Sequence, residues 1–178
     1  MNNFLYNDIF LRNTNDQNNK ESFNNVELRE DFSDDNCISS EFMVAVGRGT
    51  NTIAWSEDGK SWSPVNNSTA IFSYVGSGVA WNGSMWVAVG SGTNSIAWSE
   101  DGKNWTGLGS SIFRSGGGVA CNGSIWVAVG GSYPNISNTI AWSEDGKNWT
   151  GLGSSIFDSG RGVAWNGSIW VAIGTGSN

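Results

Sequence analysis

One nine-residue phrase, AWSEDGKNW, constrains the fold of this chain more than any other feature. It occurs at 54–62 (with Ser in place of Asn), 97–105 and 141–149, so that successive copies are 43 and 44 residues apart. Each copy has the pattern of a short strand, a tight Asp-Gly turn and the start of a second strand. A repeat of this period predicts a row of similar small sheets in place of one irregular core.

A complete repeat, 78–113, predicts four short strands at 78–81, 85–89, 95–99 and from 104 onward. Alternating apolar residues, β-branched residues and closely spaced turn residues favour strands over helices. A second complete repeat is 118–157, an incomplete one at 42–72 lacks a first strand, and another at 162–174 stops after its second, for 13 predicted strands in all. The last first-strand sequence, 162–165, is therefore able to supply the strand that the first repeat lacks.

Composition excludes several functions. The chain has 25 Gly, 11 Trp and no His. Without His there is no Ser-His-Asp triad and the commonest metal ligand is missing, so neither a metal nor another cofactor is expected. No apolar run reaches the roughly 20 residues that span a bilayer, and no secretory signal is present. Cys121 stands where the sister repeats have Trp81 and Trp165, and we interpret it as a buried free thiol.

Residues 1–41 differ sharply from 42–178. The leading segment has no Gly or Trp and holds nine acidic and three basic residues, whereas the repeats hold seven and six. Its Asn-rich, acidic composition predicts a flexible leader, and the alternative is that the short apolar stretch 4–11 docks on a partner or caps the first repeat. Neither part has the basic surface that nucleic-acid binding requires.

The phrase SEDGKxW resembles the Asp box of sialidase-like β-propellers, also called the BNR repeat, although Gly follows Asp directly and each box is one residue shorter. The near-identical repeats and Asn-rich leader are also similar to repeat proteins of giant DNA viruses. The resemblance implies an all-β, propeller-like array of four-stranded antiparallel blades, three and a fraction in this chain. The residues that match the box are Ser56, Asp58, Gly59 and Trp62, Ser99, Asp101, Gly102 and Trp105, and Ser143, Asp145, Gly146 and Trp149.

The chemistry of the box is expected to be structural. Its Ser and Asp side chains are able to accept hydrogen bonds from turn amides, its Gly supplies a positive φ, and its Trp covers the apolar end of the blade. The boxes are alike in every repeat, whereas an active site needs a set of residues that differ. Sialidases grip a carboxylate with three arginines, but Arg48, Arg114 and Arg161 occupy different repeat positions. We therefore expect no enzymatic activity.

Two connections vary between repeats, and in an up-and-down blade they emerge at the end opposite the boxes. This variable face is the candidate binding surface. On it we place Arg48, Tyr74, Arg114, Tyr133, Asp158 and Arg161. The expected function is an interaction scaffold that binds a protein partner there; the alternatives are a carbohydrate-binding lectin and, less favoured, a sialidase-like hydrolase.

Three and a fraction blades do not close a propeller, which needs about four to eight. Either the chain is part of a longer array, or two copies form a homodimer that completes a six-bladed ring by exchanging terminal strands, or the sheets remain an open stack. We favour the first two. An intracellular or virion-associated location, with no membrane partner, is expected.

Overall fold

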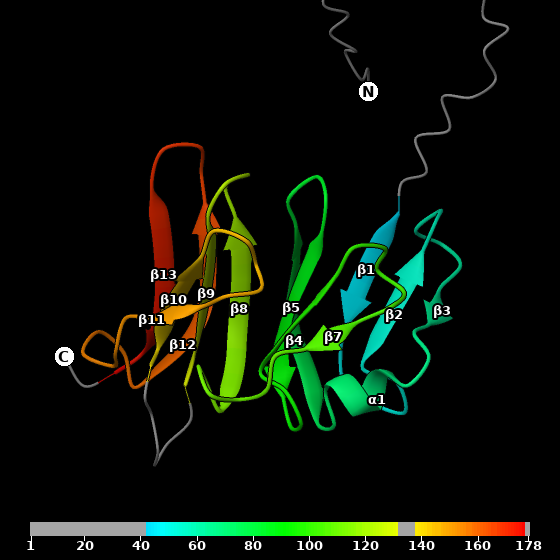
Figure 1. Cartoon of the computed structure of the whole chain (residues 1–178), viewed down its shortest axis with the longest axis horizontal. Helices are drawn as coiled ribbons and strands as arrows, with labels where there is room; N and C mark the ends of the chain where they lie inside the picture. Colours follow the sequence, from blue (N-terminus) through cyan, green and yellow to red (C-terminus); the bar gives the residue numbers. More distant parts are fainter. Residues whose placement is uncertain (1–41, 132–137, 177–178) are drawn as a thin grey trace, which may run out of the picture. The chain divides into compact units, whose positions relative to one another are not determined.

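The computed structural model describes residues 42–131 and 138–176, and in them the chain is all-β (Figure 1). Thirteen strands and one short helix are present, and every strand pairing is antiparallel. The predicted fold class is confirmed at this level. The predicted leader, residues 1–41, and with it Cys37 lie outside the described residues, as does Tyr133.

The strands fall into four successive units that follow the sequence repeats. Unit 1 contains β1 (Met43–Val46), β2 (Ile53–Ser56) and β3 (Ser63–Pro64); unit 2 contains β4 (Val75–Trp81), β5 (Trp86–Ser91), β6 (Ile96–Ser99) and β7 (Thr106–Gly107); unit 3 contains β8 (Ser115–Cys121), β9 (Trp126–Gly131), β10 (Ile140–Ser143) and β11 (Thr150–Gly151); unit 4 contains β12 (Ser159–Trp165) and β13 (Trp170–Thr175). The helix α1 (Ser68–Ile71) joins β3 to β4.

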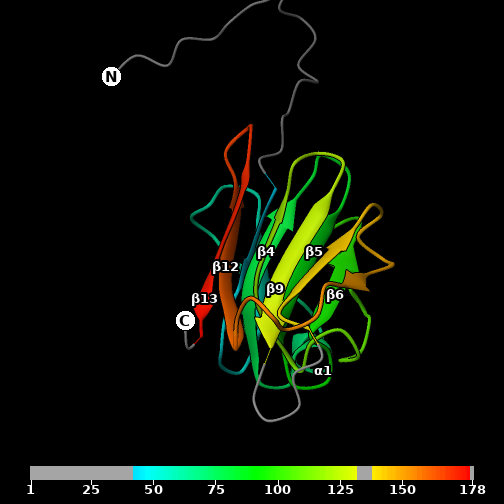
Figure 2. The ribbon, with the colours of Figure 1, turned by 90° about the vertical axis from the view of Figure 1, so that its left-hand side faces the viewer.

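Within each complete unit the strands pair in chain order, β4-β5-β6-β7 and β8-β9-β10-β11. Single pairs between Ser91 and Ser115, and between Ser159 and Gly131, link units 2, 3 and 4 into one curled sheet, while β1–β3 form a separate three-stranded sheet. Figure 2 views this arrangement from the side of β13.

The first strands of units 2, 3 and 4 are packed side by side, because glycine allows their backbones to approach closely. A Cβ on Gly78 would lie 3.3 Å from the Cα of Gly118, and a Cβ on Gly118 would lie 3.1 Å from the Cα of Gly162. These strands also begin earlier than predicted, with a register shift between Gly76 and Gly78 in β4. Glycine has a low strand propensity, which is why the sequence pattern did not reveal the extension.

The core lies between units and not within them. Val44, Ile53 and Val65 of unit 1 pack against Phe72, which precedes β4, and Ala88 of β5. The equivalent residues Val87, Ile96, Phe113 and Ala128 repeat this packing between units 2 and 3, where Trp126 is 1 % exposed. Units 1 and 2 therefore each bury one face of their sheet against the next unit.

Two details correct the sequence interpretation. The segment 162–165 lies in β12 and pairs with β13 of its own unit, not with β1, so within one chain it does not complete unit 1. Cys121 is half-buried and not fully buried. It lies opposite Trp126 in the hairpin, where the other units pair Trp81 with Trp86 and Trp165 with Trp170.

Candidate functional site

The three SEDGK turns join β2 to β3, β6 to β7 and β10 to β11, and all three have the same geometry. In the second turn, the amide of Gly102 donates to Ser99 Oγ at 2.8 Å. The Ser99 hydroxyl donates to Asp101 Oδ1 at 3.0 Å, and that oxygen also accepts from the amides of Lys103 and Asn104 at 2.8 and 2.7 Å. Gly102 has a φ of 69°, a left-handed conformation that glycine adopts without strain. These are the hydrogen bonds expected of a structural turn.

The same hydrogen bonds favour the ionised form of each turn aspartate. The amides of Ser61 and Lys60 lower the pKa of Asp58 to about 2. Burial raises the pKa of Asp101, but the backbone and side-chain amides of Asn104 outweigh it and the pKa is about 2. The amide and side chain of Asn148 lower the pKa of Asp145 further. A carboxylate held ionised in this way is a poor general acid near neutral pH.

The second and third turns also contact the preceding unit, a role that the sequence did not reveal. A Cβ on Gly102 would meet Phe42 and Val44, and a Cβ on Gly146 would meet Met85 and Val87. Trp105 and Trp149 pack against the clusters that include residues of the unit before them. Trp62 belongs to the first unit, so no described unit precedes it, and it is 44 % exposed.

The lysines of the second and third turns add polar links between units. Lys103 Nζ lies 3.6 Å from Glu57 Oε1 and 3.8 Å from the ring centroid of Trp55. One unit further along, Lys147 Nζ lies 3.3 Å from Glu100 Oε1 and 3.8 Å from the ring centroid of Trp98. The signal was present in the sequence, since Glu, Lys and the first Trp of AWSEDGK recur in all three copies.

The variable face lies at the other end of the strands, beside α1 and the connection from β5 to β6 (Figure 1). There the guanidinium of Arg48 lies 4.4 Å from the ring centroid of Tyr74, which is 55 % exposed. Tyr74 and Arg161 together line a hollow of about 370 Å³, whose other walls are Ser77, Ser91, Ser115, Ser159 and the backbone of Gly116, Gly117 and Gly160. The structure thus brings together three of the predicted residues.

Two further predicted residues of this face that the structure describes are not in the hollow. Arg114 and Asp158 are exposed in the connections that lead to β8 and β12, and neither side chain lines it. Arg114 can therefore serve as a control for Arg161 in binding experiments, because it carries the same charge at the same end of the molecule but lies outside the hollow.

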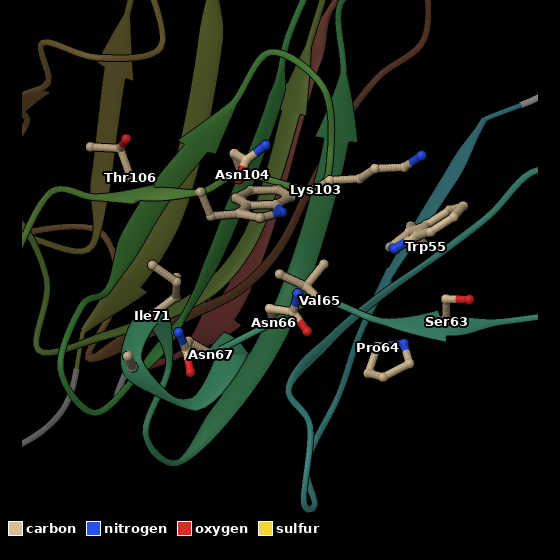
Figure 3. Close-up of a pocket in the computed structure, with 12 residues that line it drawn as sticks. Trp55, Ser63, Pro64, Val65, Asn66, Asn67, Ile71, Lys103, Asn104 and Thr106 are labelled. Atoms are coloured by element: carbon tan, nitrogen blue, oxygen red, sulfur yellow. The ribbon is translucent and has the colours of Figure 1, made fainter.

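A second, larger groove of about 660 Å³ lies between units 1 and 2 at the outer strands (Figure 3). Its walls include Trp55, Trp105 and Lys103, with Asn66 and Asn67 below. The ring of Trp55 already contacts two side chains, since it stacks on Phe42 at 5.6 Å between centroids and lies under Lys103. The groove is thus aromatic and polar, but the Trp55 ring is largely engaged.

Metal or nucleophilic chemistry finds little support in the part of the chain that the structure describes. No group of three or more His, Cys, Asp or Glu side chains lies close enough there to hold a metal ion. Burial raises the pKa of the Cys121 thiol, which reduces its thiolate fraction and reactivity. No helix in residues 42–131 or 138–176 is long and apolar enough to cross a membrane.

Comparison of the chain with models of known protein families and with curated protein sequences finds no match. The site therefore has to be interpreted from its own geometry.

Proposed function

We propose that the four units are blades of a propeller-like array with Asp-box turns, and that the chain is a non-enzymatic interaction module. The blade interpretation is supported by the in-order strand pairing, by the close packing of β4, β8 and β12, and by a core that lies between units. The partner is a protein, bound through the variable face.

The observation that carries this proposal is the hollow formed by Tyr74 and Arg161, with Arg48 stacked on Tyr74. The guanidinium of Arg48 lies 4.4 Å from the centroid of the exposed Tyr74 ring, and Arg161 lines the same hollow as Tyr74 and four serines. Arginine binds carboxylates with paired hydrogen bonds, and tyrosine supplies contact area with few rotatable bonds. This combination suits an extended protein segment that carries acidic side chains.

The test is binding of a fluorescein-labelled acidic peptide, with alternating Glu and Ser residues, followed by anisotropy. Arg161→Glu and Tyr74→Ala are expected to weaken binding at least about tenfold, because the hollow loses a charge-assisted hydrogen bond or its aromatic wall. Arg114→Glu makes the same change of charge at the same end but outside the hollow, and it should retain binding. Equal losses in Arg114→Glu and Arg161→Glu would reduce the interaction to non-specific charge attraction and refute the proposal.

A lectin is the second candidate, and the groove of Figure 3 is the observation that favours it. Indole rings and amide groups together are suited to sugar rings, which have apolar faces and polar edges. Saturable binding of one sugar class on a glycan array, lost in Trp105→Ala and unchanged in Arg161→Glu, would support the lectin over the protein-binding module.

A further inference from the structure

The interfaces between units 1 and 2 and between units 2 and 3 are two copies of one design. In each, the turn glycine of the later unit rests on two side chains of the earlier second strand. The turn Trp covers the earlier fourth-strand region, where Val65 and Leu108 are equivalent, and the turn Lys reaches the earlier Glu. The exposed surfaces of unit 3 and unit 1 can be compared with this repeated interface.

Unit 3 presents the first half of a third such interface, and only part of it is covered. Leu152 and Ile156, the equivalents of Leu108 and Ile112, are each 58 % exposed. Glu144, the equivalent of Glu100, has no cation within ion-pair distance among the described residues. Among residues 42–131 and 138–176, unit 4 contributes β12 and β13, and no third strand, turn or fourth strand of a following unit lies over this surface.

Unit 1 presents the matching second half, and no described residue of a preceding unit covers it. Its β2, SEDGK turn and β3 are the elements that would follow β13 in a complete unit. Gly59 is exposed, whereas Gly102 and Gly146 are buried against their preceding units, and Lys60 has no ion pair among the described residues. Trp62 is likewise the most exposed of the three turn Trp residues. The charge of Lys60 is opposite to that of Glu144, as in the two internal pairs.

The strands β1 and β13 hold the same position in the repeat. In unit 1, Ala45 of β1 lies opposite Ala54 of β2, just as Ala88 of β5 lies opposite Ala97 of β6. Ala172 of β13 is the equivalent residue, and among the described strands β13 pairs only with β12. The outer edge of β13 is therefore open and has the register that β2 requires.

We infer that a second copy of this chain docks its β2, turn and β3 onto β13 and unit 3, displacing its own β1 and forming a composite unit β12-β13-β2-β3. Lys60 of the second copy then meets Glu144 and Trp142, and its Trp62 covers Leu152 and Ile156. The displaced β1 loses four residue pairs with β2, and β13 gains the equivalent four. The number of paired residues in the sheet therefore does not change in the exchange. In addition, β12 supplies the first strand that unit 1 lacks.

The strand count favours closure by two copies. Without β1, the described part of each chain contributes 12 of its 13 strands, which is three four-stranded units. Propellers close with about four to eight blades, and six is the multiple of three in that range. This inference rests on the proposal that the units are blades, but not on the ligand of the variable face.

The first test is the molar mass of the full chain by light scattering over a range of concentrations. A closed pair predicts twice the chain mass of 19.0 kDa, with no larger species. A monomer at all concentrations would overturn the inference, and so would a mass that keeps rising with concentration, because a head-to-tail contact that does not close grows into filaments.

The second test uses the predicted ion pair. Lys60→Glu and Glu144→Lys should each weaken the dimer at least about fivefold, because both interfaces of the pair then oppose like charges. An equimolar mixture of the two variants should dimerise like the original chain, since every contact again joins Glu and Lys. Arg114→Glu is the control for the change of net charge. Failure of the mixture to recover would contradict the proposed contact.

The third test reports on β1 directly, in a background with Cys37→Ser and Cys121→Ala. A chain with Ala54→Cys and Ala172→Cys should form a disulfide between two copies under mild oxidation, because the two Cβ atoms face each other in the composite unit. A chain with Ala45→Cys and Ala54→Cys should not form one within a chain when dimeric. The reverse result would show that β1 stays in place. Loss of peptide binding at the variable face with an intact dimer would instead count against the proposed function alone.

Discussion

Asn94 is predicted to hold units 1 and 2 together, and its substitution by alanine is a sharp test of the packing between units. This side chain is 8 % exposed. Its Nδ2 donates to the carbonyl of Ile71 at 2.8 Å, and its Oδ1 accepts from the amide of Gly109 at 2.8 Å. One amide group thus satisfies two backbone groups that are 38 residues apart in the chain.

Asn94→Ala removes both hydrogen bonds and leaves their backbone partners without a replacement. Each neutral hydrogen bond contributes about 1 kcal/mol, and an unsatisfied buried group costs about 1–3 kcal/mol. We therefore expect the free energy of unfolding to fall by about 2–4 kcal/mol. Asn138 makes the same two contacts one unit later, to Ile112 and Gly153, so Asn138→Ala should repeat the effect.

The assay is urea unfolding followed by tryptophan fluorescence, with the midpoint compared at constant slope. Asn51 occupies the same repeat position in unit 1 but is exposed, so Asn51→Ala is a matched control expected to change stability by less than about 0.5 kcal/mol. If Asn94→Ala and Asn51→Ala lie within about 0.5 kcal/mol of each other, the two hydrogen bonds do not stabilise the junction and the reasoning is wrong.

Three further predictions follow from the turns and the thiol. Because their folded-state pKa values lie below that of an unfolded aspartate, Asp58, Asp101 and Asp145 should contribute stability that is complete above about pH 5 and lost as pH falls from about 4 through 2; unfolding midpoints between pH 7 and pH 2 measure this, and a variant with all three changed to Asn should have a flatter acid limb. Trp149→Ala should lower the free energy of unfolding by about 2–3 kcal/mol because it packs on the unit 2–unit 3 core. Trp62→Ala should cost far less when both changes are made in the Lys60→Glu chain at a concentration where light scattering finds a monomer, and equal costs by calorimetry there would contradict the unit-to-unit role of the turn. In a Cys37→Ser background, iodoacetamide should alkylate Cys121 more slowly at pH 8 than after unfolding in urea, because burial raises its pKa; equal rates would show that the site does not protect it.

Much of the fold was predictable because the same local sequence pattern recurs several times along the chain. Alternating residues and turn residues identified the strands, and the conformation of Gly59, Gly102 and Gly146 follows from the tight turn. The helix α1 was not predicted, since SPVNNSTAIF occurs once and one turn of helix has little sequence signal. The longer first strands were missed because their added residues are mostly glycine and serine, which do not produce the alternation of apolar residues that predicts a strand.

The site was less predictable, because it depends on contacts between units. Position in the repeat placed Arg48, Tyr74 and Arg161 at one end, but only the curvature of the sheet brings Tyr74 and Arg161 to the same hollow. The same reasoning grouped Arg114 and Asp158 with them, although these side chains point elsewhere from equivalent connections. The Lys-to-Glu links were also missed, since their partners are 46 and 47 residues apart and belong to different copies of the phrase.

The uniformity of the SEDGK turns now has a physical explanation that their internal hydrogen bonds alone do not provide. A turn needs Ser, Asp and Gly for its own conformation, but Glu57, Glu100 and Glu144, and likewise Lys60, Lys103 and Lys147, are not required by the turn itself. They are required by the neighbour, since every inner unit offers Glu to the next and Lys to the one before. Among the described residues, Lys60 of the first turn and Glu144 of the last have no such ion pair. Like the exposed Trp62 on unit 1 and Leu152 and Ile156 on unit 3, these groups are complementary because the described interfaces share one design. The proposed ring of two copies is the arrangement that would use both surfaces at once.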